Sequence, residues 1–164
     1  MGIDDSSECS GRLQDDAATQ ALGAALARAI APGLSIRLQG DLGAGKTTLT
    51  RALLVECGYR GRVKSPTYTL VESYPLPGMT VHHFDLYRFT DPQEWDDSGF
   101  SDYFAPDTVC LIEWPDKAGP LLPAADIELR LDVEGDGRCY HIRALTETGL
   151  ACLNRLSTPA AGSC

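Results

Sequence analysis

The sequence predicts an α/β fold with a mixed, partly parallel central sheet and an antiparallel C-terminal hairpin. The run at 108–113, TVCLIE, is apolar almost throughout, which is typical of a strand buried on both faces of a sheet. Two further runs, 126–133 and 138–145, have strand character and are separated by EGDG. They indicate a hairpin with one face on the core. Segments with helical spacing lie between the predicted strands, as layered α/β proteins require.

The first elements along the chain are a helix, a strand and a second helix. Residues 17–30 repeat apolar side chains with helical spacing, an aspartate at position 15 or 16 is a suitable N-cap, and Pro32-Gly33 ends the helix. Residues 34–39 alternate like a strand. After a glycine-rich loop, residues 46–57 again have a helical pattern, which Gly58 closes.

The middle of the chain is expected to form two strands. Residues 67–74 are rich in β-branched and aromatic side chains and stop at a turn-like PLPG segment. Residues 80–89 also have strand character, and Asp91-Pro92 has the signature of a helix start.

Length and composition predict one domain. The chain has 164 residues, and we expect the domain to span residues 1–156, followed by a disordered tail at 157–164. No apolar run approaches the ~20 residues that cross a bilayer, so no membrane association is expected. The N-terminal residues 1–8 are small, acidic and polar, unlike a signal peptide, which favours a cytoplasmic protein.

The net charge of −9 makes the chain poorly suited to bind nucleic acid by itself. One local exception is a basic cluster made of Arg51, Arg60, Arg62 and Lys64. The cluster is either a solvated basic loop or a patch that faces a phosphate-bearing ligand or an acidic partner.

Residues 40–47, GDLGAGKT, match the phosphate-binding pattern G-x-x-x-x-G-K-[ST] in full. Glycines let the backbone turn tightly and aim N–H groups at phosphate oxygens, and the N-terminus of the following helix favours the anion. Lys46 would contact the β- and γ-phosphates, and Thr47 would bind Mg²⁺. A glycine-rich turn that binds nothing is the alternative. The position between a strand and a helix favours a P-loop NTPase-like three-layer fold.

Two acidic residues end apolar strands and are expected to complete the site. Asp85 follows the strand that starts at residue 80, and Glu113 ends the run at 108–113. If both strands run parallel to 34–39, the two carboxylates meet beside the P-loop, because ligands bind at the carboxyl ends of parallel strands. The alternative is that each is a solvated acid at a strand end. The neighbouring His82 and His83 point to opposite faces, so we expect structural or hydrogen-bonding roles for them.

Three classes of P-loop protein compete. A GTPase is disfavoured, because the guanine-reading N-K-x-D pattern is absent and the one asparagine is Asn154. A small-molecule kinase remains the alternative, although it would need an acceptor pocket and an arginine-bearing lid. An ATPase that serves a larger assembly suits a short chain with no evident substrate domain.

The order of motifs resembles the TsaE family, formerly called YjeE. The similarity runs from about residue 15 to residue 144 and rests on the segments GDLGAGKTT (40–48), VKSPTYTLVESY (63–74), HHFDLYR (82–88), the stretch 91–104, and LIEWPDKAG (111–119). The resemblance implies an ATPase needed for N6-threonylcarbamoyladenosine (t6A) at position 37 of tRNAs that read ANN codons. It also implies action with a TsaB–TsaD complex, through which the chain meets tRNA only indirectly. Since the sequence supplies phosphate and metal groups but no obvious arginine finger, we expect weak hydrolysis by the isolated chain and activation by partner proteins.

The resemblance also implies roles for individual residues. It places ATP phosphates on a run formed by Leu42, Gly43, Ala44, Gly45, Lys46 and Thr47, and we expect Thr48 to belong to the nucleotide-binding residues as well. It assigns Mg²⁺ to Thr47 and Glu113, with Asp85 at the Walker-B position, so that Lys46, Asp85 and Glu113 form the catalytic set. Residues 65–67 match a switch-like loop beside the γ-phosphate. Asp16 and Arg138 are expected at the nucleoside end.

Overall fold

A computed structural model describes residues 7–156 and shows one seven-stranded sheet in the order β1-β7-β6-β2-β5-β4-β3. The strands are β1 (Glu8–Leu13), β2 (Ser35–Gln39), β3 (Val71–Leu76), β4 (Met79–Asp85), β5 (Thr108–Glu113), β6 (Ile127–Glu134) and β7 (Gly137–Ala144). The predicted tail at 157–164 lies outside the described residues.

The sheet is mixed, as the sequence predicts. β2 lies between β5 and β6 and is parallel to both, and β4 is parallel to β5. β6 and β7 form the expected antiparallel hairpin, while β1 and β3 pair antiparallel at the two edges. The parallel strands β4, β2 and β5 therefore present their carboxyl ends at one edge of the sheet, where ligands bind in open α/β folds.

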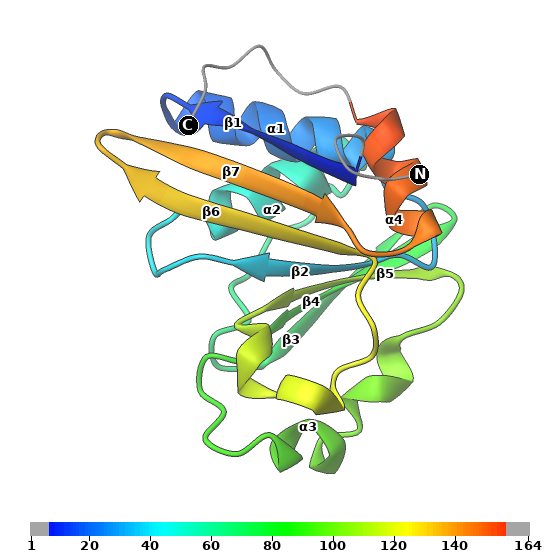
Figure 1. Cartoon of the computed structure of the whole chain (residues 1–164). Helices are drawn as coiled ribbons and strands as arrows, with labels where there is room; N and C mark the ends of the chain where they lie inside the picture. The colour runs from blue at the N-terminus through cyan, green and yellow to red at the C-terminus, as the bar shows by residue number, and fades with distance from the viewer. Residues whose placement is uncertain (1–6, 157–164) are drawn as a thin grey trace.

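Helices cover both faces of the sheet (Figure 1). On one face, α1 (Asp16–Ala29), α2 (Lys46–Glu56) and α4 (Glu147–Arg155) share a large apolar core with the strands. On the other face, α3 (Gln93–Asp97) and short 3₁₀ turns bury an aromatic core that includes Phe84 and Trp95. β5 contributes to both cores, Val109 and Leu111 to the first and Cys110 and Ile112 to the second, which explains why its sequence is apolar throughout.

Helix α1 positions the phosphate loop because it packs closely on α2. Asp15 caps α1, accepting a hydrogen bond from the Ala18 N–H at 2.9 Å. Further along the helix, Gly23 faces α2, and a Cβ at this position would lie 2.4 Å from the Leu49 carbonyl oxygen. A side chain here would push the two helices apart.

Several elements differ from the sequence-based expectation. β1 and α4 were not predicted. The strand expected at 67–74 starts only at Val71, because the residues before it form turns, and the strand expected at 80–89 ends at Asp85. Among the described helices, none combines the length and the apolarity that crossing a bilayer requires.

Candidate functional site

The loop between β2 and α2 adopts a backbone that glycine favours. Gly43 and Gly45 have φ values of 82° and 104°, in the left-handed region. A Cβ on Gly40 would lie 2.5 Å from the Leu131 carbonyl oxygen, so the loop passes directly over β6. Gly45 is the N-cap of α2 and provides no side-chain cap, which leaves the amides of the first turn available for an anion.

A cavity of about 250 Å³ lies in front of this loop and brings together residues from six parts of the chain. Its lining consists of Asp16, Leu42, Gly43, Gly45, Lys46, Thr47, Thr48, Ser65, Thr67, Asp85, Glu113 and Arg138. All the site residues expected from the sequence thus line the cavity except Ala44, which is buried within the loop. A larger hollow of about 470 Å³ lies between α1 and α2, but its lining includes none of Lys46, Asp85 and Glu113. We place the site in the smaller cavity, where the charged groups converge.

The two strand-end carboxylates lie side by side, as the parallel arrangement requires. Asp85 of β4 is in register with Glu113 of β5. Both side chains are largely buried, at 8% and 5% exposed respectively. Asp85 is held by the Tyr87 N–H, which donates to its Oδ1 at 3.0 Å. Burial is the main cause that raises the pKa of Asp85, and the nearby charge of Glu113 raises it further.

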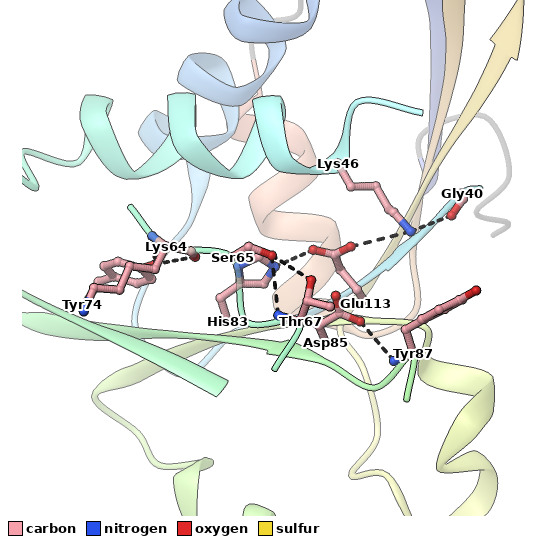
Figure 2. A network of polar contacts seen from close by, with 10 residues as sticks. All are labelled: Gly40, Lys46, Lys64, Ser65, Thr67, Tyr74, His83, Asp85, Tyr87 and Glu113. Atoms are coloured by element: carbon pink, nitrogen blue, oxygen red, sulfur yellow. Dashed lines mark hydrogen bonds and ion pairs between the residues drawn. The ribbon is translucent and has the colours of Figure 1, made fainter. Parts of the chain in front are cut away.

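Lys46 is buried at the first position of α2 and has three partners, of which Gly40 and Glu113 are drawn in Figure 2. Its ammonium group donates to the Gly40 carbonyl oxygen, lies 3.5 Å from Glu113 Oε1, and lies 4.3 Å from the centre of the Trp114 ring. These contacts fix the lysine between the phosphate loop and the carboxylates. Trp114, at φ 57°, turns the chain sharply directly after Glu113.

Glu113 has a second partner on the opposite side, His83 of β4. The distance from His83 Nε2 to Glu113 Oε2 is 2.6 Å. Burial alone would raise the pKa of Glu113, but the hydrogen bond from His83 and the charge of Lys46 outweigh it and lower the pKa.

The loop that precedes β3 forms one wall of the cavity. Ser65 Oγ and Thr67 Oγ1 are 2.8 Å apart, and both residues line the cavity. The Tyr74 hydroxyl donates to the Lys64 carbonyl oxygen and accepts from the Lys64 N–H, both at 3.0 Å, which attaches the loop to β3 (Figure 2). The backbone at Leu70 has φ 71°, so the chain reverses here before the strand begins.

Arg138 holds the phosphate loop from the β7 side. Its Nε donates to the Ala44 carbonyl oxygen and one terminal nitrogen donates to the Gly43 carbonyl oxygen, both at 3.0 Å. The same arginine, with Asp16, borders an adjoining hollow of about 260 Å³ at the end of the site away from Glu113. Arg138 is expected near the nucleoside, but its hydrogen bonds to the carbonyl oxygens of the phosphate loop were not predicted.

The oxygen donors at the cavity are of the kind that could hold Mg²⁺ together with the phosphates of a nucleotide. Within residues 7–156, no group of three or more His, Cys, Asp or Glu side chains is arranged to hold a metal. Mg²⁺ is usually bound by one or two carboxylates, water and substrate phosphates. Asp85, Glu113 and the Thr47 hydroxyl supply such oxygen ligands beside a loop suited to phosphates.

Comparison with known proteins gives consistent matches. The model of the family described as "Threonylcarbamoyl adenosine biosynthesis protein TsaE" matches residues 13–140. A protein named tRNA threonylcarbamoyladenosine biosynthesis protein TsaE from Haemophilus influenzae is 48% identical over 124 residues, covering 76% of this chain and 78% of that protein. Its namesake from Bacillus subtilis is 36% identical over 118 residues, covering 72% and 73%. The crystal structure of Bacillus subtilis YdiB has a TM-score of 0.71 and 27% identity, covering 90% of this chain and 93% of that one.

Proposed function

Because this chain belongs to the TsaE family of threonylcarbamoyl adenosine biosynthesis proteins, we propose that it binds and hydrolyses ATP with Mg²⁺ in the service of tRNA modification. The modification is t6A at position 37 of tRNAs that read ANN codons. The observation that carries the ATPase proposal is the cavity in which Lys46, Thr47, Asp85 and Glu113 meet the first turn of α2.

Each group has a role in this proposal. The loop amides and Lys46 would bind the β- and γ-phosphates, and Thr47, Glu113 and Asp85 would hold Mg²⁺. When bound, Mg²⁺ offsets the charge that develops during phosphoryl transfer. Thr67 and Ser65 face the same space and are placed to contact the γ-phosphate or the attacking water.

The arginines of the structure support a dependence on partners. Arg138 lines the cavity, but its guanidinium is bonded to loop carbonyls. An arginine finger raises phosphoryl-transfer rates by about 10³–10⁵ where one operates. We therefore propose that the isolated chain is a slow ATPase and that a TsaB–TsaD complex in the cytoplasm completes the site. The basic cluster of Arg51, Arg60, Arg62 and Lys64 is exposed, and none of its residues lines the cavity. It is a suitable contact for this complex.

The decisive experiment measures phosphate release from ATP by the purified chain, alone and with TsaB, TsaD and tRNA. We expect slow release that requires Mg²⁺ and increases when the complex is added, together with t6A formation. Thr47→Ala is the matched negative control. Fast hydrolysis that ignores the partners would refute the assembly role, and transfer of the phosphoryl group to a metabolite instead of water would favour a kinase.

A further inference from the structure

His83 is a buried side chain that the proposed phosphate chemistry does not use. It lies on β4 two residues before Asp85 and is 2% exposed. Its Nδ1 is buried without a hydrogen-bond partner, so in the described part of the chain Glu113 is the one hydrogen-bonding partner of this imidazole. Burying a polar side chain that makes a single hydrogen bond costs free energy. We therefore expect this one contact to have a role.

The direction of this hydrogen bond follows from the state of Glu113. A carboxylate that holds a metal ion is ionised and only accepts hydrogen bonds, so Nε2–H of His83 is the donor and Oε2 of Glu113 the acceptor. The other carboxylate oxygen, Oε1, faces Lys46 and the phosphate loop at 3.5 Å. The two oxygens of Glu113 are therefore directed to opposite sides, one toward the core and one toward the cavity (Figure 2).

We propose that His83 is a positioning residue that anchors Oε2 of Glu113, so that Oε1 stays directed at the metal ion of a bound Mg²⁺–nucleotide complex. A glutamate without such an anchor has several rotamers, and only some of them direct an oxygen at the cavity. Partners that orient a metal-binding carboxylate contribute about 10–100-fold to metal affinity or activity. The inference rests on the proposed function, because it assigns Glu113 to the metal.

His82 provides a matched control within the same strand. It points to the opposite face of the sheet and packs against the edge of Tyr103, with 4.9 Å between ring centres. Its Nδ1 lies 2.7 Å from Ser73 Oγ, on the strand β3. Replacing either His82 or His83 removes a histidine from β4, but only His83 contacts the site.

The test compares ADP affinity by calorimetry with Mg²⁺ and with EDTA, for wild type, His83→Leu, His83→Gln and His82→Leu. We expect Mg²⁺ to tighten ADP binding in wild type and in His82→Leu, and about 10–100-fold less tightening in His83→Leu. Binding in EDTA should stay within about twofold in all four proteins, because the loop and Lys46 hold the phosphates. In His83→Gln the amide nitrogen reaches the position of Nε2 and should restore most of the effect.

The outcomes separate the two proposals. Equal tightening by Mg²⁺ in wild type and His83→Leu overturns the role of His83 and leaves the proposed function in place. A glutamine variant that behaves like the leucine variant also overturns it, because the role would then be packing. Absence of any Mg²⁺ effect in wild type overturns the metal site itself. If His83→Leu does not fold, His83→Asn replaces it, since its amide stops short of Glu113.

Discussion

Arg138→Ala tests how the phosphate loop is held in shape. The substitution removes the two hydrogen bonds that the guanidinium donates to the carbonyl oxygens of Gly43 and Ala44, each 3.0 Å long. The peptide unit that carries the Gly43 carbonyl also carries the Ala44 N–H, which donates to the Asp41 carbonyl oxygen at 3.0 Å, so Arg138 and this turn hold the same stretch of the loop. Without the arginine, the loop keeps its glycines but loses the contact that selects one of its conformations.

The magnitude follows from the charge and the exposure of Arg138. A hydrogen bond from a charged group contributes about 1.5–3 kcal/mol. Arg138 is half-buried, so water can replace part of the interaction and the lower end of that range applies. Two bonds at that end, about 3 kcal/mol, correspond to an upper limit of roughly 100-fold in affinity. We expect ADP to bind about 10–100-fold more weakly to Arg138→Ala, by calorimetry.

Arg143→Ala is the control, because Arg143 lies on the same strand but pairs with Glu128 at the surface, where such pairs contribute about 0–1 kcal/mol. It should bind ADP as wild type does. Arg138→Lys should recover only part of the loss, since an ammonium group cannot reproduce the planar guanidinium contacts. If Arg138→Ala binds ADP within twofold of wild type while remaining folded, the arginine does not organise the loop and the reasoning is wrong.

Three further predictions concern the phosphate loop, the choice of nucleotide base and the two carboxylates of the cavity. Lys46→Ala and Thr47→Ala should each abolish measurable phosphate release from ATP. The first removes the positive charge that contacts the phosphates, and the second removes a Mg²⁺ ligand. Wild-type turnover in either variant would reject the P-loop assignment. ADP should bind at least tenfold tighter than GDP, about 1.4 kcal/mol in calorimetry, because the guanine-reading motif is absent; the reverse order would contradict this. The two carboxylates should have opposite effects on stability in urea unfolding followed against pH. Asp85→Asn should stabilise the protein at neutral pH, because burial raises the Asp85 pKa and its charge opposes folding, and this gain should fade as the pH falls through the raised value. Glu113→Gln should destabilise it, since the Glu113 pKa is lowered in the fold, and the loss should shrink as the pH falls below 4.5. Equal and pH-independent effects would show that neither charge is coupled to folding.

The parts of the fold that the sequence predicts well are those in which a local pattern and the tertiary environment agree. The strand before the P-loop, β2, helix α2 and the apolar strand β5 all have strong local signals. The parallel pairing of β2 with β5 follows from the need to bury both faces of β5. β1 gives a weak signal because serine and glycine interrupt it. Its Gly11 lies against the ring of Tyr140, so the strand forms through pairing with β7 rather than through its own propensity.

Helix α4 was missed for a related reason. Its buried stripe consists of Gly149, Cys152 and Leu153, and small residues give little periodic signal. Thr146, which caps the helix by accepting from the Gly149 N–H, was the available clue. In the candidate site, the sequence alone located the lysine, the hydroxyl and both carboxylates, but contacts across the sheet, such as the one between His83 and Glu113, depend on strand register, which a single sequence does not provide.

The pairing of Lys46 with Glu113 has a consequence for how ligands arrive. A phosphate oxygen that attracts Lys46 takes a partner from Glu113, and a cation that binds Glu113 takes a partner from Lys46. Phosphate binding to Lys46 leaves the negative charge of Glu113 without its partner, and a cation would compensate it. Cation binding to Glu113 likewise leaves the positive charge of Lys46 without its partner, and a phosphate would compensate it. The two ligands are therefore expected to bind with positive cooperativity, and the factor by which Mg²⁺ strengthens nucleotide binding must equal the factor by which nucleotide strengthens Mg²⁺ binding. A site of this kind discriminates against bare metal and against metal-free nucleotide, and selects the complex of the two.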